Sequence, residues 1–257
     1  MNLSGTSIST KSSSDKNVSK PIEKEIITSI NNIDFNIKIA RITTLLYSII
    51  FVLTFISIAL QIVLFTTNDY EHLAALFNLD KEENVPTFFA SLTLVFASLL
   101  FYVIYREKKI NEDKYKKNWA ILSVLFFLMG ADEFLALHEQ TSRYLWNIAG
   151  GFRFAWIIPG TLFVILFAIY YLKFFLSLDN RWKIRFFTAA AIYLSGTLGM
   201  EFLDGLFQMR FGQENLTYSV MTNFEEMLEM IGVVFLIQTL LLYIHSHSQK
   251  IIIKVKE

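Results

Sequence analysis

Six apolar stretches, each long enough to cross a lipid bilayer as a helix, constrain the fold of this chain more than any other feature. A membrane-spanning helix needs roughly 17 to 25 predominantly apolar residues to cross about 30 Å of hydrocarbon. The stretches that meet this requirement are 43–65, 87–105, 119 to about 139, 154–178, 186–205 and 224–244. Backbone polar groups inside a bilayer must be satisfied within the protein. The sequence therefore predicts an all-α, polytopic membrane helix bundle with six transmembrane helices and the lipid bilayer as its environment.

The composition agrees with this class and excludes several others. Hydrophobic residues make up 54% of the 257 residues, and only 18% are charged, which is typical of a membrane protein. With 23 basic and 23 acidic residues and no basic stripe, nothing indicates nucleic acid as a partner. The chain contains no Cys and only four His. A disulfide framework, an iron–sulfur cluster and a histidine-rich metal site are therefore excluded.

The distribution of Lys and Arg predicts the orientation, because loops rich in these residues stay in the cytoplasm. On one side of the six stretches lie only four of the 23 basic residues, namely Lys81, Arg143, Arg153 and Arg210. We therefore expect both termini in the cytoplasm (N-in/C-in) of a multi-pass protein in a bacterial plasma (inner) membrane. Three regions follow: a polar cytoplasmic segment 1–39, disordered and then an amphipathic helix; the six-helix domain 40–246; and a short basic tail 247–257.

Carboxylates occur in three of the predicted spans, always toward the same end of the molecule. They are Asp132, Glu133 and Glu139, with His138, in the third span; Glu201 and Asp204 in the fifth; and Glu225, Glu226 and Glu229 in the sixth. Spans three and five run outward and span six runs inward, so all three groups fall near the extracytoplasmic face. Spacings of three, four and seven residues place Glu201 with Asp204, Glu225 with Glu229, and Asp132 with Glu139 on common helix faces.

Some of these acids have a purely structural explanation. Thr222 with Glu225 fits a capping box at the start of the sixth span, where the helix dipole also favours Glu226. Glu139 fits a hydrated position at the membrane interface. Deeper acids, such as Glu133, are costly in a bilayer and usually mark a functional site.

Such a layer either shares protons or binds a cation. Oxygen ligands favour Mn²⁺, Fe²⁺, Mg²⁺ or Ca²⁺ over Zn²⁺. The predicted ligands of a divalent metal are Asp132, Glu139, Glu201, Asp204, Glu226 and Glu229. Glu133 and His138 are the candidates for general acid/base catalysis. Arg153 and Trp156 precede the fourth span and fit either an aromatic belt with a snorkelling Arg or a contact with a lipid headgroup.

Three functions fit these features. A metal-dependent enzyme would act on a membrane-embedded, lipid-like or small-molecule substrate. A cation- or proton-coupled transporter would use the same carboxylates as a relay, although Gln238 is the main polar candidate in the cytoplasmic halves of the spans. In a non-catalytic accessory or sensor protein, the acids would form a structural polar network. In the fifth span, Ala191, Ser195 and Gly199 form a small-residue ladder that predicts close helix packing.

Overall fold

The computed structural model describes residues 16–67, 69–136, 157–212 and 215–254, with side chains described between 34 and 247. Its contacts divide the chain into two units, Met1–Arg41 and Ile42–Glu257. Helix α1 (Lys16–Thr67) runs through both units, and the other helices belong to the second. The described residues contain no strand, as the predicted fold class requires.

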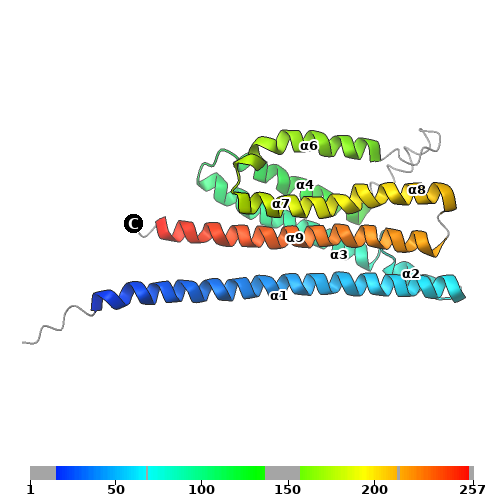
Figure 1. The fold of residues 1–257 in the computed structure, drawn as a ribbon, viewed down its shortest axis with the longest axis horizontal. Helices are drawn as coiled ribbons and strands as arrows, with labels where there is room; N and C mark the ends of the chain where they lie inside the picture. Colours follow the sequence, from blue (N-terminus) through cyan, green and yellow to red (C-terminus); the bar gives the residue numbers. More distant parts are fainter. Residues whose placement is uncertain (1–15, 68, 137–156, 213–214, 255–257) are drawn as a thin grey trace, which may run out of the picture. The chain divides into compact units, whose positions relative to one another are not determined.

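Six helical segments are long and apolar enough to span a membrane: Asp34–Thr67, Val85–Ile110, Lys116–Leu135, Ile157–Ser177, Asn180–Phe211 and Leu216–His247. They correspond one to one with the predicted spans. The elements that follow α1 are α2 (Glu71–Phe77), α3 (Val85–Ile110), α4 (Lys116–Leu135), α6 (Ile157–Ser177), α7 (Asn180–Leu194), the π-helix η1 (Ser195–Met200), α8 (Glu201–Phe211) and α9 (Leu216–Lys254) (Figure 1). The fifth span is thus one continuous segment built from α7, η1 and α8.

The third span is shorter than predicted. Helix α4 ends at Leu135, and Ala136 adopts the left-handed conformation with φ 55°. A left-handed residue directly after the last helical turn is a common helix end. His138 and Glu139 lie outside the described residues, so the prediction that Asp132 and Glu139 share one helix face stays a prediction.

The sixth span begins earlier than predicted. The Asn215 side chain accepts a hydrogen bond from the backbone N–H of Tyr218 at 2.9 Å, which caps the start of α9. Thr222 lies inside α9 and donates its hydroxyl hydrogen bond to the backbone oxygen of Ser219 at 3.0 Å. The capping-box explanation of Glu225 is therefore wrong, and the prediction that the dipole of a first turn favours Glu226 fails with it.

Helix α9 packs against several other elements of the Ile42–Glu257 unit. It packs against α3, α7, η1 and α8, while α3 packs against α4. The α3–α4 interface contains reciprocal hydrogen bonds, from Ser98 Oγ to the Ser123 oxygen at 2.7 Å and from Ser123 Oγ to the Ser98 oxygen at 3.0 Å. Hydroxyl groups that bond across helices are a usual means of association in membranes.

Two glycines permit the close approach of the fifth and sixth spans. A Cβ atom on Gly196 would lie 2.8 Å from the Glu225 carbonyl oxygen and 2.8 Å from Glu229 Cγ, and one on Gly232 would lie 2.7 Å from the Tyr193 nitrogen. Neither position has room for a methyl group. The contact therefore depends on glycine at both positions.

The predicted small-residue ladder does not make this contact. Ala191, Ser195 and Gly199 are exposed, and a Cβ on Gly199 would meet nothing within 4 Å. Gly196 packs on α9 instead. The ladder prediction is wrong because the span contains a π-helix and presents a different face to α9.

We expect Gly196→Ala and Gly232→Ala to lower the stability of the folded protein. An added methyl in a close-packed contact costs about 1 to 3 kcal/mol, which exceeds the gain of about 0.5 to 1 kcal/mol that Ala normally brings in a helix. Thermal unfolding in detergent measures the difference, with Gly199→Ala as the control that keeps or raises the melting temperature. Equal melting temperatures for the three variants would contradict the packing.

Candidate functional site: a carboxyl cluster

A small cavity lies where four helices meet. Its polar lining consists of Glu133 from α4, Tyr193 from α7, and Glu226 and Glu229 from α9, with Thr93 of α3 among apolar side chains. Its volume is about 10 Å³. That is close to the minimum that holds one water molecule, so the cavity has room for one small ion or one water.

Two hydroxyl side chains lie beside the Glu229 carboxyl group. They belong to Tyr193 and Thr197, and the Thr197 hydroxyl donates to the Tyr193 carbonyl oxygen at 3.1 Å. The close approach at Gly196 brings these groups to α9. A π-helix inserts one extra residue into a helical turn and occurs frequently at functional sites. Here η1 supplies both Gly196 and Thr197.

Glu226 lies among other acids. The charged groups that act on it include Glu229, Glu133, Asp80 and Glu82. The last two come from the loop between α2 and α3. This loop is held in shape by the side chain of Asn84. The cluster thus gathers acids from α4, α9 and the α2–α3 loop.

A second pair lies beside the first group. Asp204 is only 3% exposed, and its two carboxyl oxygens have no hydrogen-bond partner among the described residues. Glu225 and Glu201 both act on it electrostatically. A buried carboxylate without a partner is costly. A proton or a cation on the Asp204 oxygens would lower that cost.

Charge repulsion makes a fully ionised cluster unfavourable. Two like charges about 4 Å apart at an effective dielectric of about 20 repel by about 4 kcal/mol. Lys38–Asp34 and Lys108–Glu107 are ion pairs of other described residues. A proton or a bound cation at Asp204, whose carboxyl oxygens have no hydrogen-bond partner among the described residues, would reduce this repulsion.

Three of the predicted site residues, Glu133, Glu226 and Glu229, line the cavity. Glu201 and Asp204 act electrostatically on Glu225, and the functional roles predicted for these residues stay predictions. Asp132 is half-buried and is not among the side chains that line the cavity. Among the described residues, no three His, Cys, Asp or Glu side chains are arranged so that they could hold a metal ion together. The predicted metal site and its choice of metal therefore stay predictions. His138, Glu139, Arg153 and Trp156 lie outside the described residues.

A polar group in the other half of the bundle was missed in the sequence. Arg185 of α7 donates to Gln238 Oε1 at 2.9 Å and to Thr239 Oγ1 at 3.3 Å, and Gln238 reaches Thr43 Oγ1 at 3.5 Å. Arg185 sits near the start of a span, where a snorkelling side chain is the ordinary expectation. Its inward direction has no signal in the sequence apart from the polar residues opposite.

Comparison with known proteins gives one match. A family described as a domain of unknown function (DUF8692) matches residues 46–244, which covers all six spans at least in part. No curated protein and no solved structure matches.

We expect Asp204→Asn to stabilise the protein by roughly 1 to 2 kcal/mol, because the Asp204 carboxyl oxygens are buried without a hydrogen-bond partner among the described residues and a neutral amide costs less to bury than a carboxylate. A carboxyl group loses its proton as the pH rises and an amide does not, so the advantage of the variant should grow with pH. Melting temperatures across a pH series test this, with the exposed loop variant Glu112→Gln as control. A constant difference between Asp204→Asn and the wild type at all pH values would contradict a proton on Asp204.

Proposed function

This chain belongs to the DUF8692 family, and we propose that it is a multi-pass membrane protein that couples protons or small cations to transport through its carboxyl cluster. The observation that carries this proposal is the burial of Asp204 beside Glu225 and Glu201, with no hydrogen-bond partner for its two carboxyl oxygens among the described residues. A proton and a cation satisfy the same oxygens, so one can replace the other with little rearrangement. Intramembrane acids commonly serve as proton relays in pumps and transporters.

The size of the adjacent cavity supports an ion over an organic substrate. About 10 Å³ between Glu133, Glu226 and Glu229 is far below the roughly 300 to 1,000 Å³ of ordinary ligand pockets. A metal-dependent enzyme with a lipid-like substrate is the second proposal for this layer. An enzyme of this kind would need metal ligands such as Glu201 and Glu229 and also a substrate cleft beyond this cavity. The small cavity therefore favours the coupled transporter over the enzyme.

A second polar layer supports transport over a purely local site. Gln238, which accepts a hydrogen bond from Arg185 of α7, lies about nine residues from Glu229 along α9. This separation is roughly 14 Å at the rise of an α-helix. Between the two layers α9 buries Val233, Val234 and Ile237. A coupled carrier needs an ion site that does not open to both sides at once, and this apolar layer provides the separation.

The proposed orientation follows the Lys and Arg distribution. With both termini in the cytoplasm of a bacterial plasma membrane, the carboxyl cluster faces the extracytoplasmic side and the Arg185 layer faces the cytoplasm. Protons or cations would then enter the acidic layer from outside. Cysteine accessibility at engineered loop positions tests this orientation, since the natural chain has no Cys.

Infrared difference spectra between acidic and alkaline buffer read protonated carboxyl groups directly. We expect bands from buried carboxyl groups in the wild type, the loss of one band in Glu229→Gln and of another in Asp204→Asn, and no change in Glu112→Gln. If Mn²⁺ or Ca²⁺ removes the same bands and mass spectrometry finds the metal bound, the cation is a metal ion. If the spectra show no protonated carboxyl group at any pH and no cation is bound, the proposal is contradicted.

Proteoliposomes containing a pH-sensitive dye test the transport step. An imposed gradient of Na⁺, K⁺, Mg²⁺, Ca²⁺ or Mn²⁺ should move protons through the wild type and at least ten-fold more slowly through Glu229→Gln. Carboxyl bands without any cation-driven proton movement would instead favour a sensor or accessory role.

A further inference from the structure

A larger cavity lies at the opposite end of the Ile42–Glu257 unit. Its volume is about 350 Å³, within the range of small-molecule sites and equal to roughly a dozen water molecules. It is half-open, and its lining includes residues of two loops together with Tyr243 and His247 of α9. Its charged lining residues are Lys108, Asp113 and Lys114 from the α3–α4 loop and Asp179 from the α6–α7 loop.

The α3–α4 loop fixes Lys108 and Asp113 relative to each other. Glu112 has a left-handed φ of 51°. The Asp113 N–H bonds the Lys108 carbonyl oxygen at 2.9 Å and the Glu112 N–H bonds that of Lys109 at 3.3 Å. This is the hydrogen-bond pattern of a Schellman motif. The two positions that usually share an apolar contact in this motif carry opposite charges here, and both line the cavity.

Asp179 is held in place by the backbone rather than by its side chain. It occupies the N-cap position of α7, where an Asp carboxylate usually accepts a backbone hydrogen bond, yet its side chain makes no capping bond. Its backbone oxygen accepts from Trp182 and Lys183 instead. The carboxylate lines the cavity, opposite the charged residues of the α3–α4 loop.

Aromatic rings line the cavity between these charged side chains. Trp119 packs against Phe174 and Tyr243 with centroids 5.0 and 5.1 Å apart, and Trp182 packs against Tyr243 at 5.1 Å. These rings pack on one another. An aromatic belt at a membrane interface would also explain the rings, but it would not explain a cavity that is lined by charges of both signs.

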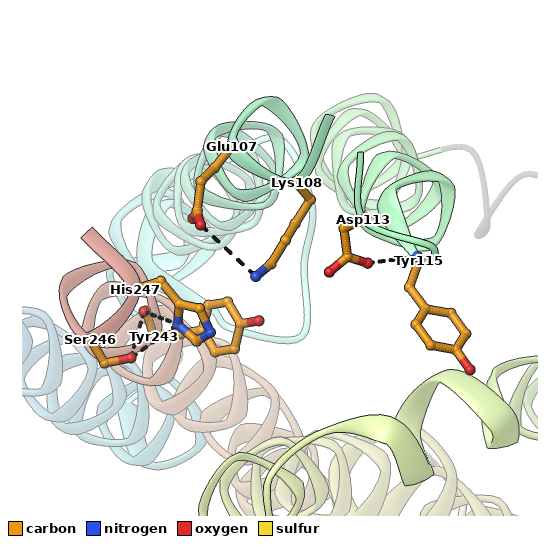
Figure 2. A network of polar contacts seen from close by, with 7 residues as sticks. All are labelled: Glu107, Lys108, Asp113, Tyr115, Tyr243, Ser246 and His247. Atoms are coloured by element: carbon orange, nitrogen blue, oxygen red, sulfur yellow. Dashed lines mark hydrogen bonds and ion pairs between the residues drawn. The ribbon is translucent and has the colours of Figure 1, made fainter. Parts of the chain in front are cut away.

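Lys108 is a partly buried cation of this site. Its side chain is 12% exposed, and its Nζ lies 5.5 Å from the centre of the Tyr243 ring. The distance to Glu107 Oε1 is 3.9 Å, too long for a hydrogen bond. Figure 2 shows the Lys108 and Asp113 side chains next to each other, with Tyr243 on one side and Tyr115 on the other. The ammonium can therefore donate to an anion in the cavity.

We propose that this cavity binds a phosphoethanolamine group, in which a phosphate carries a primary amine. Lys108 binds the phosphate, with Lys114 at the exposed edge, and the Asp113 and Asp179 carboxylates accept from the ammonium. A phosphate alone would be repelled by the two carboxylates, and an amine alone by the lysines. The group would come from the headgroup of an aminophospholipid or from a free zwitterion of the same chemistry.

Fluorescence of the full chain in detergent tests this, because Trp119 and Trp182 line the cavity. The probes are free phosphoethanolamine and short-chain phosphatidylethanolamine, phosphatidylcholine and phosphatidylglycerol. We expect phosphatidylethanolamine to bind at least ten-fold tighter than the other two lipids. Equal binding of free phosphoethanolamine identifies a soluble ligand, and binding of the lipid alone identifies a membrane lipid as the source.

Three variants separate the site from general membrane affinity. Lys108→Met and Asp179→Asn should each weaken binding of phosphatidylethanolamine at least ten-fold, while the exposed neighbour variant Lys109→Met should bind like the wild type. If Lys108→Met does not fold, Asp179→Asn decides. No preference among the three lipids, or wild-type binding by Asp179→Asn, would overturn the proposal.

Discussion

The contact between the fifth and sixth spans is the constraint on which the site depends. At Gly196 and Gly232 the two backbones approach so closely that neither glycine could carry a Cβ. This approach places the Tyr193 and Thr197 side chains on Glu229. A wider contact would leave the Glu229 carboxyl group without its two hydroxyl partners. The geometry of the acidic layer is therefore set by backbone packing, and the acids are held in a frame that does not rely on them.

This frame explains how acids can be tolerated together inside a bundle. Burying an ionised carboxylate costs several kcal/mol unless it is paired or neutralised. Hydroxyl groups of Tyr193 and Thr197 lie beside Glu229, whereas the two carboxyl oxygens of Asp204 are buried without a hydrogen-bond partner among the described residues. A proton or cation at Asp204 would reduce this cost. In the proposed function, occupancy of the site and stability of the bundle are therefore linked.

The sequence predicts the spans and the common end of the acids, because both depend on long-range hydropathy and on chain direction. It does not predict helix ends. Residues 216–223 are mixed in polarity, so the start of α9 depends on the Asn215 cap rather than on an apolar pattern. The apolar periodicity of the sequence gives no sign of the π-helix Ser195–Met200. The sequence therefore does not show that Gly196 contacts α9 and that Gly199 does not. Arg185 was missed for a similar reason, since only tertiary structure decides whether such a side chain turns inward.

The two ends of the bundle solve the same problem of buried charge in different ways. At the acidic end Glu133, Glu226 and Glu229 surround a space of about 10 Å³, which suits the proton or single ion that we propose there. At the other end charges of both signs surround about 350 Å³, which suits the proposed ligand that carries both signs itself. Cavity size and charge sign together are the basis of both proposals. Since the apolar layer of α9 separates the two sites, occupancy of one can influence the other only through movement of the helices that they share.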